Sequence, residues 1–156
     1  MATFFDRLDP RALLRHPLAY AAHSRLAASQ VRKRDFVDRF LKPEPGDRVL
    51  DIGCGTAALL PLMPDVVYVG FDLSRDYIER ARKTHGARGE FHHRALTADA
   101  AAEFEPFDLI MAIGVLHHLD DQEAELLFQV AHGALRQGGR LLTCDGTFVS
   151  GQSLTA

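Results

Sequence analysis

Short apolar runs alternate with helical patterns from Arg48 almost to the end of the chain. The run at 109–115, LIMAIGV, is apolar at successive positions, which is typical of a strand covered by helices on both faces of a sheet. Repeated strand–helix–strand units favour parallel pairing. The predicted strands are 48–53, 66–72, 90–95, 107–114 and 140–146, and the predicted helices between them are 57–63, 74–86, 97–104 and 122–137. We therefore predict an α/β fold with a doubly wound, mostly parallel sheet in the order 3-2-1-4-5.

A chain of 156 residues has room for one domain with a substantial core. Apolar residues spaced by three or four positions in 10–41 predict helices, and a turn-forming cluster of prolines and a glycine follows at 43–47. We predict a single domain, 1–156, made of a helical N-terminal cap at 1–42, an α/β core at 43–146 and a tail at 147–156.

The net charge and the lengths of the apolar runs limit which kinds of partner we expect. Eighteen basic and twenty-one acidic side chains give a net charge of −3, which favours neither nucleic acid nor an anionic membrane as a partner. No apolar run approaches the roughly 20 residues that cross a bilayer, and the first ten residues lack the pattern of a secretory signal. The only cysteines, Cys54 and Cys144, have no CxxC spacing, and no metal-binding motif is present. We expect a cytoplasmic protein with free thiols and no metal.

The strongest local motif is VLDIGCGTAA at 49–58, where a strand-like run ends in closely spaced glycines. Gly53 and Gly55 allow close approach of a ligand to the backbone, and Asp72 ends the next predicted strand, where a carboxylate can accept hydrogen bonds from ribose hydroxyls. An ordinary turn and a helix cap are the alternatives for these residues. The pattern fits both a dinucleotide site and a sulfonium nucleoside site.

Further motifs separate these two sites. DIGCG at 51–55 is followed by GFDLS at 70–74, FDLI at 107–110, VLHHLDD at 115–121 and LRQGGRLLTCDG at 135–146. In this order and spacing, the chain from Pro43 to Gly146 resembles the class I S-adenosylmethionine-dependent methyltransferases.

This resemblance implies a Rossmann-like methyltransferase fold and S-adenosylmethionine as cofactor, with S-adenosylhomocysteine as product. It places the methionine part of the cofactor over the loop Gly53–Gly55, supported by Asp51, and the ribose at Asp72. Leu73 would pack against the adenine, and Ala95 and Leu96 would border it from the other side. Cys54 lies between the loop glycines, so its backbone is expected to matter more than its thiol.

The chain departs from the family pattern at three points. Many relatives have an acidic residue near Ala95 that contacts the adenine amino group, whereas the nearest acid here is Asp99, so we assign no such contact. Ala57 stands where a third loop glycine is common, a change that is tolerable if a helix has already begun there. The family usually continues past the fifth strand with a helix and two more strands, whereas this chain ends within eleven residues of that motif. We therefore expect a C-terminally short fold whose fifth strand has an open edge, covered by the tail or by self-association, unless the chain is a truncated piece. Asp108 is expected to have a structural role near the floor of the cofactor pocket.

His117 follows the fourth predicted strand at the edge where doubly wound folds bind ligands. Its imidazole suits a general base at neutral pH, and a packed or solvated turn histidine is the alternative. No NPPY-like tetrapeptide is present, and the VLHHL form resembles methyltransferases of small molecules. We predict S-adenosylmethionine-dependent methyl transfer to a small-molecule acceptor, with His117 as the candidate catalytic residue. The alternatives are an NAD-dependent oxidoreductase and a non-catalytic or truncated nucleoside-binding module.

Overall fold

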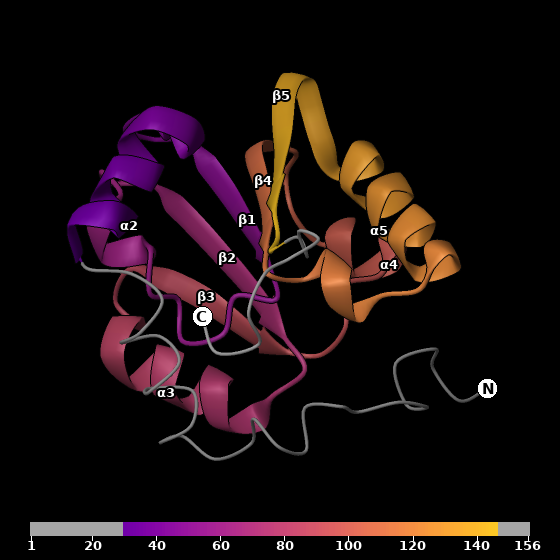
Figure 1. Cartoon of the computed structure of the whole chain (residues 1–156), viewed down its shortest axis with the longest axis horizontal. Helices are drawn as coiled ribbons and strands as arrows, with labels where there is room; N and C mark the ends of the chain where they lie inside the picture. Colours follow the sequence, from indigo (N-terminus) through magenta and orange to yellow (C-terminus); the bar gives the residue numbers. More distant parts are fainter. Residues whose placement is uncertain (1–29, 147–156) are drawn as a thin grey trace, which may run out of the picture.

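A computed structural model describes residues 30–146, and its centre is a five-stranded sheet (Figure 1). The strands are β1 (Arg48–Ile52), β2 (Val67–Asp72), β3 (Gly89–His93), β4 (Phe107–Ile113) and β5 (Leu135–Cys144). All neighbouring strands pair in parallel, in the order β3-β2-β1-β4-β5. The predicted doubly wound fold and strand order are therefore confirmed.

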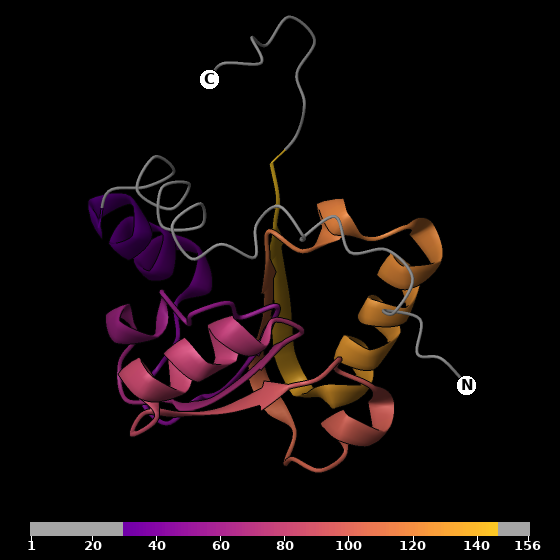
Figure 2. The ribbon, with the colours of Figure 1, turned by 90° about the horizontal axis from the view of Figure 1, so that it is seen from below.

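Helices cover both faces of the sheet, which Figure 2 shows edge-on. The elements on one face are α2 (Gln30–Phe36), the π-helix η3 (Val37–Leu41), the short 3-10 helix η4 (Leu60–Leu62) and α3 (Arg75–His85). The other face carries α4 (Ala98–Ala101) and α5 (Asp121–Ala134), and the 3-10 helix η5 (Leu116–His118) follows β4.

Each face of the sheet has its own hydrophobic core because successive strand residues point to opposite sides. Val49 and Met111 pack with Ile78 of α3 on one side. Leu50 and Ile110 pack with Ala131 of α5 on the other. This double coverage explains why the strands read as continuous apolar runs.

The segment after β1 differs from the prediction of a helix at 57–63. The structure has turns followed by the three-residue η4, in which Pro61 occupies one of the first two positions. An α-helix running through Pro61 would lose one backbone hydrogen bond, and the proline ring would clash with the carbonyl of residue 57. Ala57 has a left-handed backbone with φ of 54°, so the expectation that a helix has already begun there is wrong.

The start of β5 also differs from the prediction. The sequence predicts a helix to residue 137 and a turn at Gly138–Gly139, but α5 ends at Ala134 and β5 begins at Leu135. A register shift separates the pair Phe107–Leu135 from the pair Leu109–Arg140, so the glycines lie in an irregular part of the strand. Within residues 30–146, β5 pairs only with β4 and forms the edge of the sheet, as predicted.

Of the predicted N-terminal cap, residues 30–41 are helical, and residues 1–29 lie outside the described part of the chain, as does the tail at 147–156. None of the helices within residues 30–146 is long and apolar enough to cross a membrane.

Candidate functional site

The loop after β1 contains the two glycines singled out by the sequence. Gly53 and Gly55 both have left-handed backbones, with φ of 72° and 54°. A Cβ atom added to Gly53 would lie 2.7 Å from Cγ2 of Val115, so the segment after β4 packs directly on this loop. The positions therefore require glycine for backbone conformation and, at Gly53, also for space.

Three successive N–H groups of this loop are satisfied by β2 and its end. The N–H groups of Gly53 and Cys54 donate to the carbonyl oxygen of Phe71, at 2.8 and 3.0 Å. The N–H of Gly55 donates to Oδ2 of Asp72 at 2.9 Å. Because these donors point into the protein, they do not form an anion-binding cradle of the kind that holds a dinucleotide pyrophosphate.

Asp72 joins the glycine loop to the start of α3. Its Oδ1 accepts a 2.7 Å hydrogen bond from the N–H of Ser74, while its Oδ2 holds Gly55. Each carboxylate oxygen can accept more than one hydrogen bond, so both retain capacity for ribose hydroxyls. The residue is buried, with 8% of its surface exposed, at the carboxyl end of β2.

Asp51 is also buried and lies in β1, two residues before Gly53. Its Oδ2 accepts a 2.5 Å hydrogen bond from the hydroxyl of Tyr68 on the neighbouring strand β2. Burial raises the pKa of Asp51 to about 7, the Tyr68 hydrogen bond opposes this, and the negative Asp72 adds to it. A cation placed here would favour the ionised carboxylate.

Cys54 contributes to the loop through its backbone and its packing. Its thiol is buried, and an atom at the Cβ position of Gly70 would lie 2.8 Å from its Sγ. Burial raises the pKa of the Cys54 thiol far above the ordinary value and so favours the neutral thiol.

The residues predicted to border the adenine follow neighbouring strands. Leu73 follows β2, and Ala95 and Leu96 follow β3, so all three lie at the carboxyl edge that carries the glycine loop. All three are partly exposed, and Leu96 packs against the core beneath α4. His93 Nε2 lies 3.0 Å from the carbonyl oxygen of Leu73 and ties the ends of β2 and β3 together.

His117 lies in η5, beyond β4, and contacts a residue that the sequence analysis did not identify. Its Nδ1 is 2.7 Å from Oδ1 of Asp145, which follows β5. The His117 ring also lies 3.8 Å, centroid to centroid, from that of His118. Within residues 30–146, no group of three or more His, Cys, Asp or Glu side chains is arranged to hold a metal ion.

Asp108 has the expected structural role, but its predicted place near the cofactor pocket is wrong. It lies at the amino end of β4, where its carboxylate accepts a 2.8 Å hydrogen bond from the N–H of Arg48 and pairs with Arg136. These contacts, the Arg48 N–H first, hold the pKa of Asp108 below its usual range. The glycine loop lies at the opposite, carboxyl edge of the sheet.

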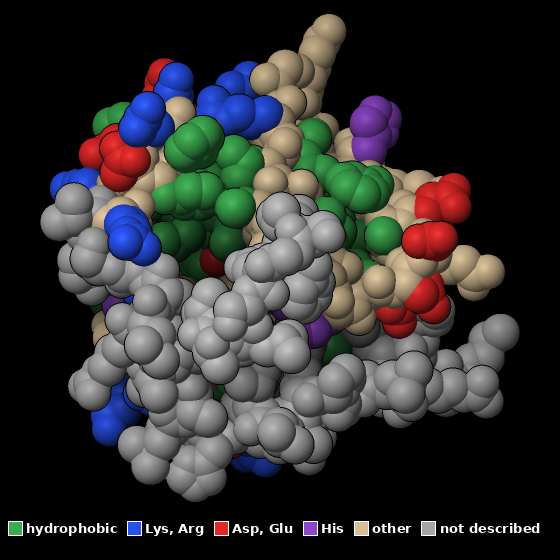
Figure 3. All heavy atoms as spheres, in the orientation of Figure 1, with side chains coloured by type: hydrophobic (Ala, Val, Ile, Leu, Met, Phe, Trp, Pro, Cys, Tyr) green, Lys and Arg blue, Asp and Glu red, His purple; other side chains and the backbone are tan. Residues whose placement is uncertain are grey.

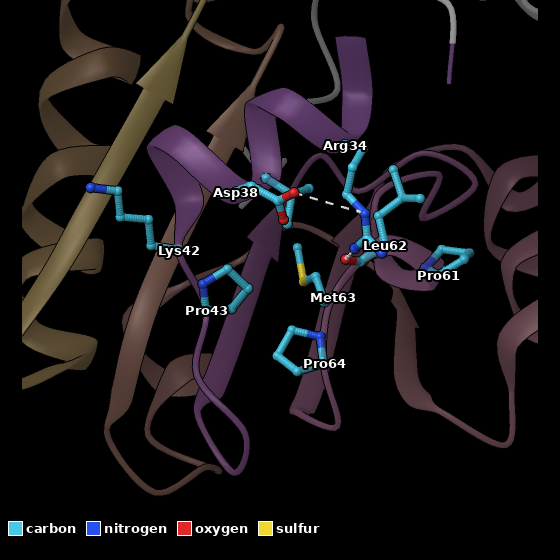
Figure 4. A pocket seen from close by; sticks show the side chains of 9 residues that line it. Arg34, Asp38, Lys42, Pro43, Pro61, Leu62, Met63 and Pro64 are labelled. Carbon is cyan, nitrogen blue, oxygen red and sulfur yellow. Dashed lines mark hydrogen bonds and ion pairs between the residues drawn. The ribbon is translucent and has the colours of Figure 1, made fainter. Parts of the chain in front are cut away.

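A cavity of about 450 Å³ lies between η3 and the segment 61–64 (Figure 4). Pro43 and Pro64, which precede β1 and β2, line it together with the ion pair of Arg34 and Asp38. None of the predicted site residues lines this cavity, so it is separate from the glycine loop.

Comparison with known proteins decides between the cofactor classes. A family model described as a methyltransferase domain matches residues 50–141, more than half of the chain. The chain belongs to the class I S-adenosylmethionine-dependent methyltransferases. This methyltransferase is 33% identical over 121 residues to the tRNA (carboxymethyluridine(34)-5-O)-methyltransferase of Saccharomyces cerevisiae, covering 73% of the chain and 42% of the relative.

Two further relatives of this methyltransferase are also matched over only part of their length. It is 32% identical over 128 residues to the 27-O-demethylrifamycin SV methyltransferase of Amycolatopsis mediterranei, covering 77% of the chain and 46% of the relative. A mycolic acid cyclopropane synthase solved with SAH (S-adenosylhomocysteine) is 26% identical, with a TM-score of 0.61 over 73% of this chain and 41% of that one. The chain thus spans less than half the length of these relatives.

Proposed function

We propose that this methyltransferase binds S-adenosylmethionine at the carboxyl edge of β1 and β2 and transfers its methyl group to a small molecule. The observation that carries the proposal is the glycine loop fastened to Asp72, with a buried carboxylate, Asp51, directly before it. A solved relative holds S-adenosylhomocysteine, which supports the choice of cofactor.

The residues present fit the two polar ends of this cofactor. Asp72 retains acceptor capacity for both ribose hydroxyls. Asp51 is a buried carboxylate whose ionisation is opposed by burial and by Asp72, and the ammonium of the methionine part would supply the missing cation. Leu73, Ala95 and Leu96 supply apolar surface for the adenine at the same edge.

Residues 30–146 contribute to methyl transfer by holding the cofactor in a fixed position relative to the acceptor. When bound, S-adenosylmethionine supplies an electrophilic methyl group. The loop Gly53–Gly55, Asp51 and Asp72 fix the direction of that group, and holding two reactants in line lowers the barrier by several kcal/mol without a covalent intermediate. His117, beyond Val115, is placed to accept a proton from an acceptor that carries one.

An NAD-dependent activity has no support. Three successive loop N–H groups are used internally, and no α-helix follows the loop to direct its amino end at a pyrophosphate. Isothermal titration calorimetry with S-adenosylhomocysteine and with NAD tests this. We expect binding of the first only, and binding of NAD without binding of S-adenosylhomocysteine would contradict the proposal.

A small-molecule acceptor is supported by charge and by one relative. Figure 3 shows acidic side chains gathered over α5, and the basic side chains over α2 are interspersed with acidic ones. A continuous basic surface for nucleic acid is absent from this view of the described residues. The rifamycin relative is named for a small-molecule acceptor, whereas the yeast relative is named for a tRNA. The purified protein can be assayed with total tRNA and with hydroxylated aromatic compounds as methyl acceptors. Methylation of the tRNA but not of the aromatic compounds would contradict a small-molecule acceptor.

Two remaining proposals concern location and self-association. Both Cys54 and Cys144 are free thiols, which supports a cytoplasmic location.

The outer edge of β5 offers unpaired backbone groups within the described part of the chain, which supports pairing with a second copy. Sedimentation of a concentration series tests this, because a monomer at all concentrations would contradict it.

A further inference from the structure

The ends of β4 and β5 bring His117 and Asp145 together, although 28 positions separate them. The two strands are parallel and paired up to Ile113 and Cys144. The pairing extends one step further, because the N–H of Gly114 donates to the carbonyl oxygen of Cys144 at 2.8 Å. Gly114, with φ of 69°, then turns the chain into η5. The pairing of the two strands therefore brings the segments that carry His117 and Asp145 side by side.

Asp145 contacts His117 at two atoms. Its Oδ1 lies 2.7 Å from Nδ1 and accepts a weaker, 3.3 Å hydrogen bond from the His117 backbone N–H. Its Oδ2 is buried and has no hydrogen-bond partner among the residues that the structure describes. The side chain is 15% exposed, whereas that of His117 is 46% exposed. The carboxylate is thus enclosed and directed at the imidazole, and the imidazole faces solvent.

This geometry fixes which ring nitrogen carries the proton. An ionised carboxylate only accepts hydrogen bonds, so Nδ1 of His117 must be the donor. In the neutral imidazole, Nε2 then has a free lone pair and can take up a proton. The same carboxylate stabilises the imidazolium that forms, as the carboxylate of a Ser-His-Asp triad does.

We infer that Asp145 is a positioning residue that holds His117 as the Nδ1–H tautomer, so that Nε2 deprotonates a hydroxyl acceptor during methyl transfer. The inference rests on the proposed function. In the step, the hydroxyl proton moves to Nε2 while the acceptor oxygen forms a bond to the methyl carbon. The carbon–sulfur bond breaks with its electron pair going to sulfur. The products are a methyl ether, neutral S-adenosylhomocysteine and an imidazolium paired with Asp145.

His117 is close to the proposed methyl-transfer centre through the packing of its own segment. Val115, two residues earlier, lies against the backbone of Gly53 in the cofactor loop. The ring carbon Cε1 of His117 lies 3.8 Å from the position of a Cβ on Gly114, at the same turn. A substrate hydroxyl has to lie near the loop to receive the methyl group, and Nε2 is presented from this turn.

Nitrogen NMR of the histidine side chains tests the inference without a known acceptor. Spectra are recorded above the range in which imidazoles titrate, for the whole chain and for the variants Asp145→Asn, Asp145→Glu and Asp121→Asn. We expect Nδ1–H and an unprotonated Nε2 for His117 in the wild type, in Asp145→Glu and in the control Asp121→Asn. Asp145→Asn should shift the tautomer toward Nε2–H. A wild-type Nε2–H tautomer, or no change in Asp145→Asn, would overturn the inference.

Titration with S-adenosylhomocysteine provides the second readout. The Nε2 resonance of His117 should move on binding, while that of His132 on the outer face of α5 should not. The affinity for S-adenosylhomocysteine should remain within about twofold in Asp145→Asn, because Asp145 positions a base and does not hold the cofactor. Binding without any change at His117 overturns the inference and leaves the proposed function standing. No binding with the expected tautomer overturns the proposed function and, with it, the role assigned to the pair.

Discussion

The hydroxyl of Tyr68 donates a 2.5 Å hydrogen bond to Asp51 across two buried, neighbouring strands. This contact supplies a donor to a carboxylate that has been removed from water, and the remaining charge is left for a ligand to balance. Proton uptake or release by Asp51 should therefore reveal whether a charged ligand binds beside the glycine loop.

Binding of S-adenosylhomocysteine should release a proton from Asp51. The pKa of this residue is raised to about 7 by burial, and a bound ammonium would favour the ionised form. Calorimetry in two buffers of different ionisation enthalpy should show release of about one proton near pH 6 and almost none near pH 8.5. The variant Asp51→Asn should show none at either pH. Equal proton release by this variant and the wild type would contradict the role of Asp51.

The same carboxyl group should make stability depend on pH in a defined direction. Its pKa is about 7 in the folded protein and 3.8 in its ordinary state, so folding favours the protonated form. The stabilising contribution is therefore complete below pH 3.8 and is lost as the pH rises to about 7. Tyr68→Phe removes the hydrogen bond that lowers the pKa of Asp51, so in this variant the loss of stability should extend to higher pH. Urea unfolding across this range, compared with Asp51→Asn, checks the prediction.

Substitutions of Asp72 should separate its two tasks. Asp72→Ala removes the acceptor for Gly55 and for the ribose, so cofactor affinity should fall by about 1.5 to 3 kcal/mol, with a less ordered loop. Asp72→Asn keeps one oxygen as acceptor and should lose less affinity. A change of less than twofold in folded Asp72→Ala would remove this residue from the site.

Gly53→Ala should destabilise the protein by about 2 to 4 kcal/mol, from the left-handed backbone and from the clash with Val115. Adding Val115→Ala to this variant should relieve the clash, so that only the free-energy cost of the left-handed backbone remains. Urea unfolding of the two single variants and the double variant gives this coupling directly. Strict additivity would show that the close approach of Gly53 and Val115 is absent.

Ala57→Gly should stabilise the protein by about 0.5 to 1 kcal/mol. Alanine in the left-handed region costs about 1 to 2 kcal/mol, and the greater freedom of glycine in the unfolded chain offsets part of the gain. The control Ala58→Gly has no positive φ to relieve and should destabilise or leave stability unchanged. A lower melting temperature for Ala57→Gly would contradict the strain assigned to this position.

The sheet could be predicted from the sequence because its determinants are local. Continuous apolar runs mark strands covered on both faces, and the run 107–114 coincides with β4 to within one residue. The helix predicted at 57–63 failed because Pro61 and the left-handed Ala57 outweigh the helical spacing of the leucines. The register of the Gly138–Gly139 segment depends on pairing with β4, which spacing alone does not reveal.

The site was predicted in part for a similar reason. Gly53, Gly55 and Asp72 lie in short motifs, and the structure joins Gly55 to Asp72 and Gly53 to Phe71, the residue before Asp72. Tyr68 and Asp145 were missed because their roles arise from strand adjacency, which places each beside a residue far away in the chain. The only signal for Asp145 was its position near the end of the fifth predicted strand, 140–146, which is expected to lie beside the strand that precedes His117.

A crystal structure of the protein with S-adenosylhomocysteine would test the central claim most directly. We expect both ribose hydroxyls within hydrogen-bond distance of Asp72 and the ammonium of the amino-acid part at Asp51, above the loop of Gly53 and Gly55. A nucleoside bound elsewhere, for example in the cavity lined by Arg34 and Pro64, would contradict it.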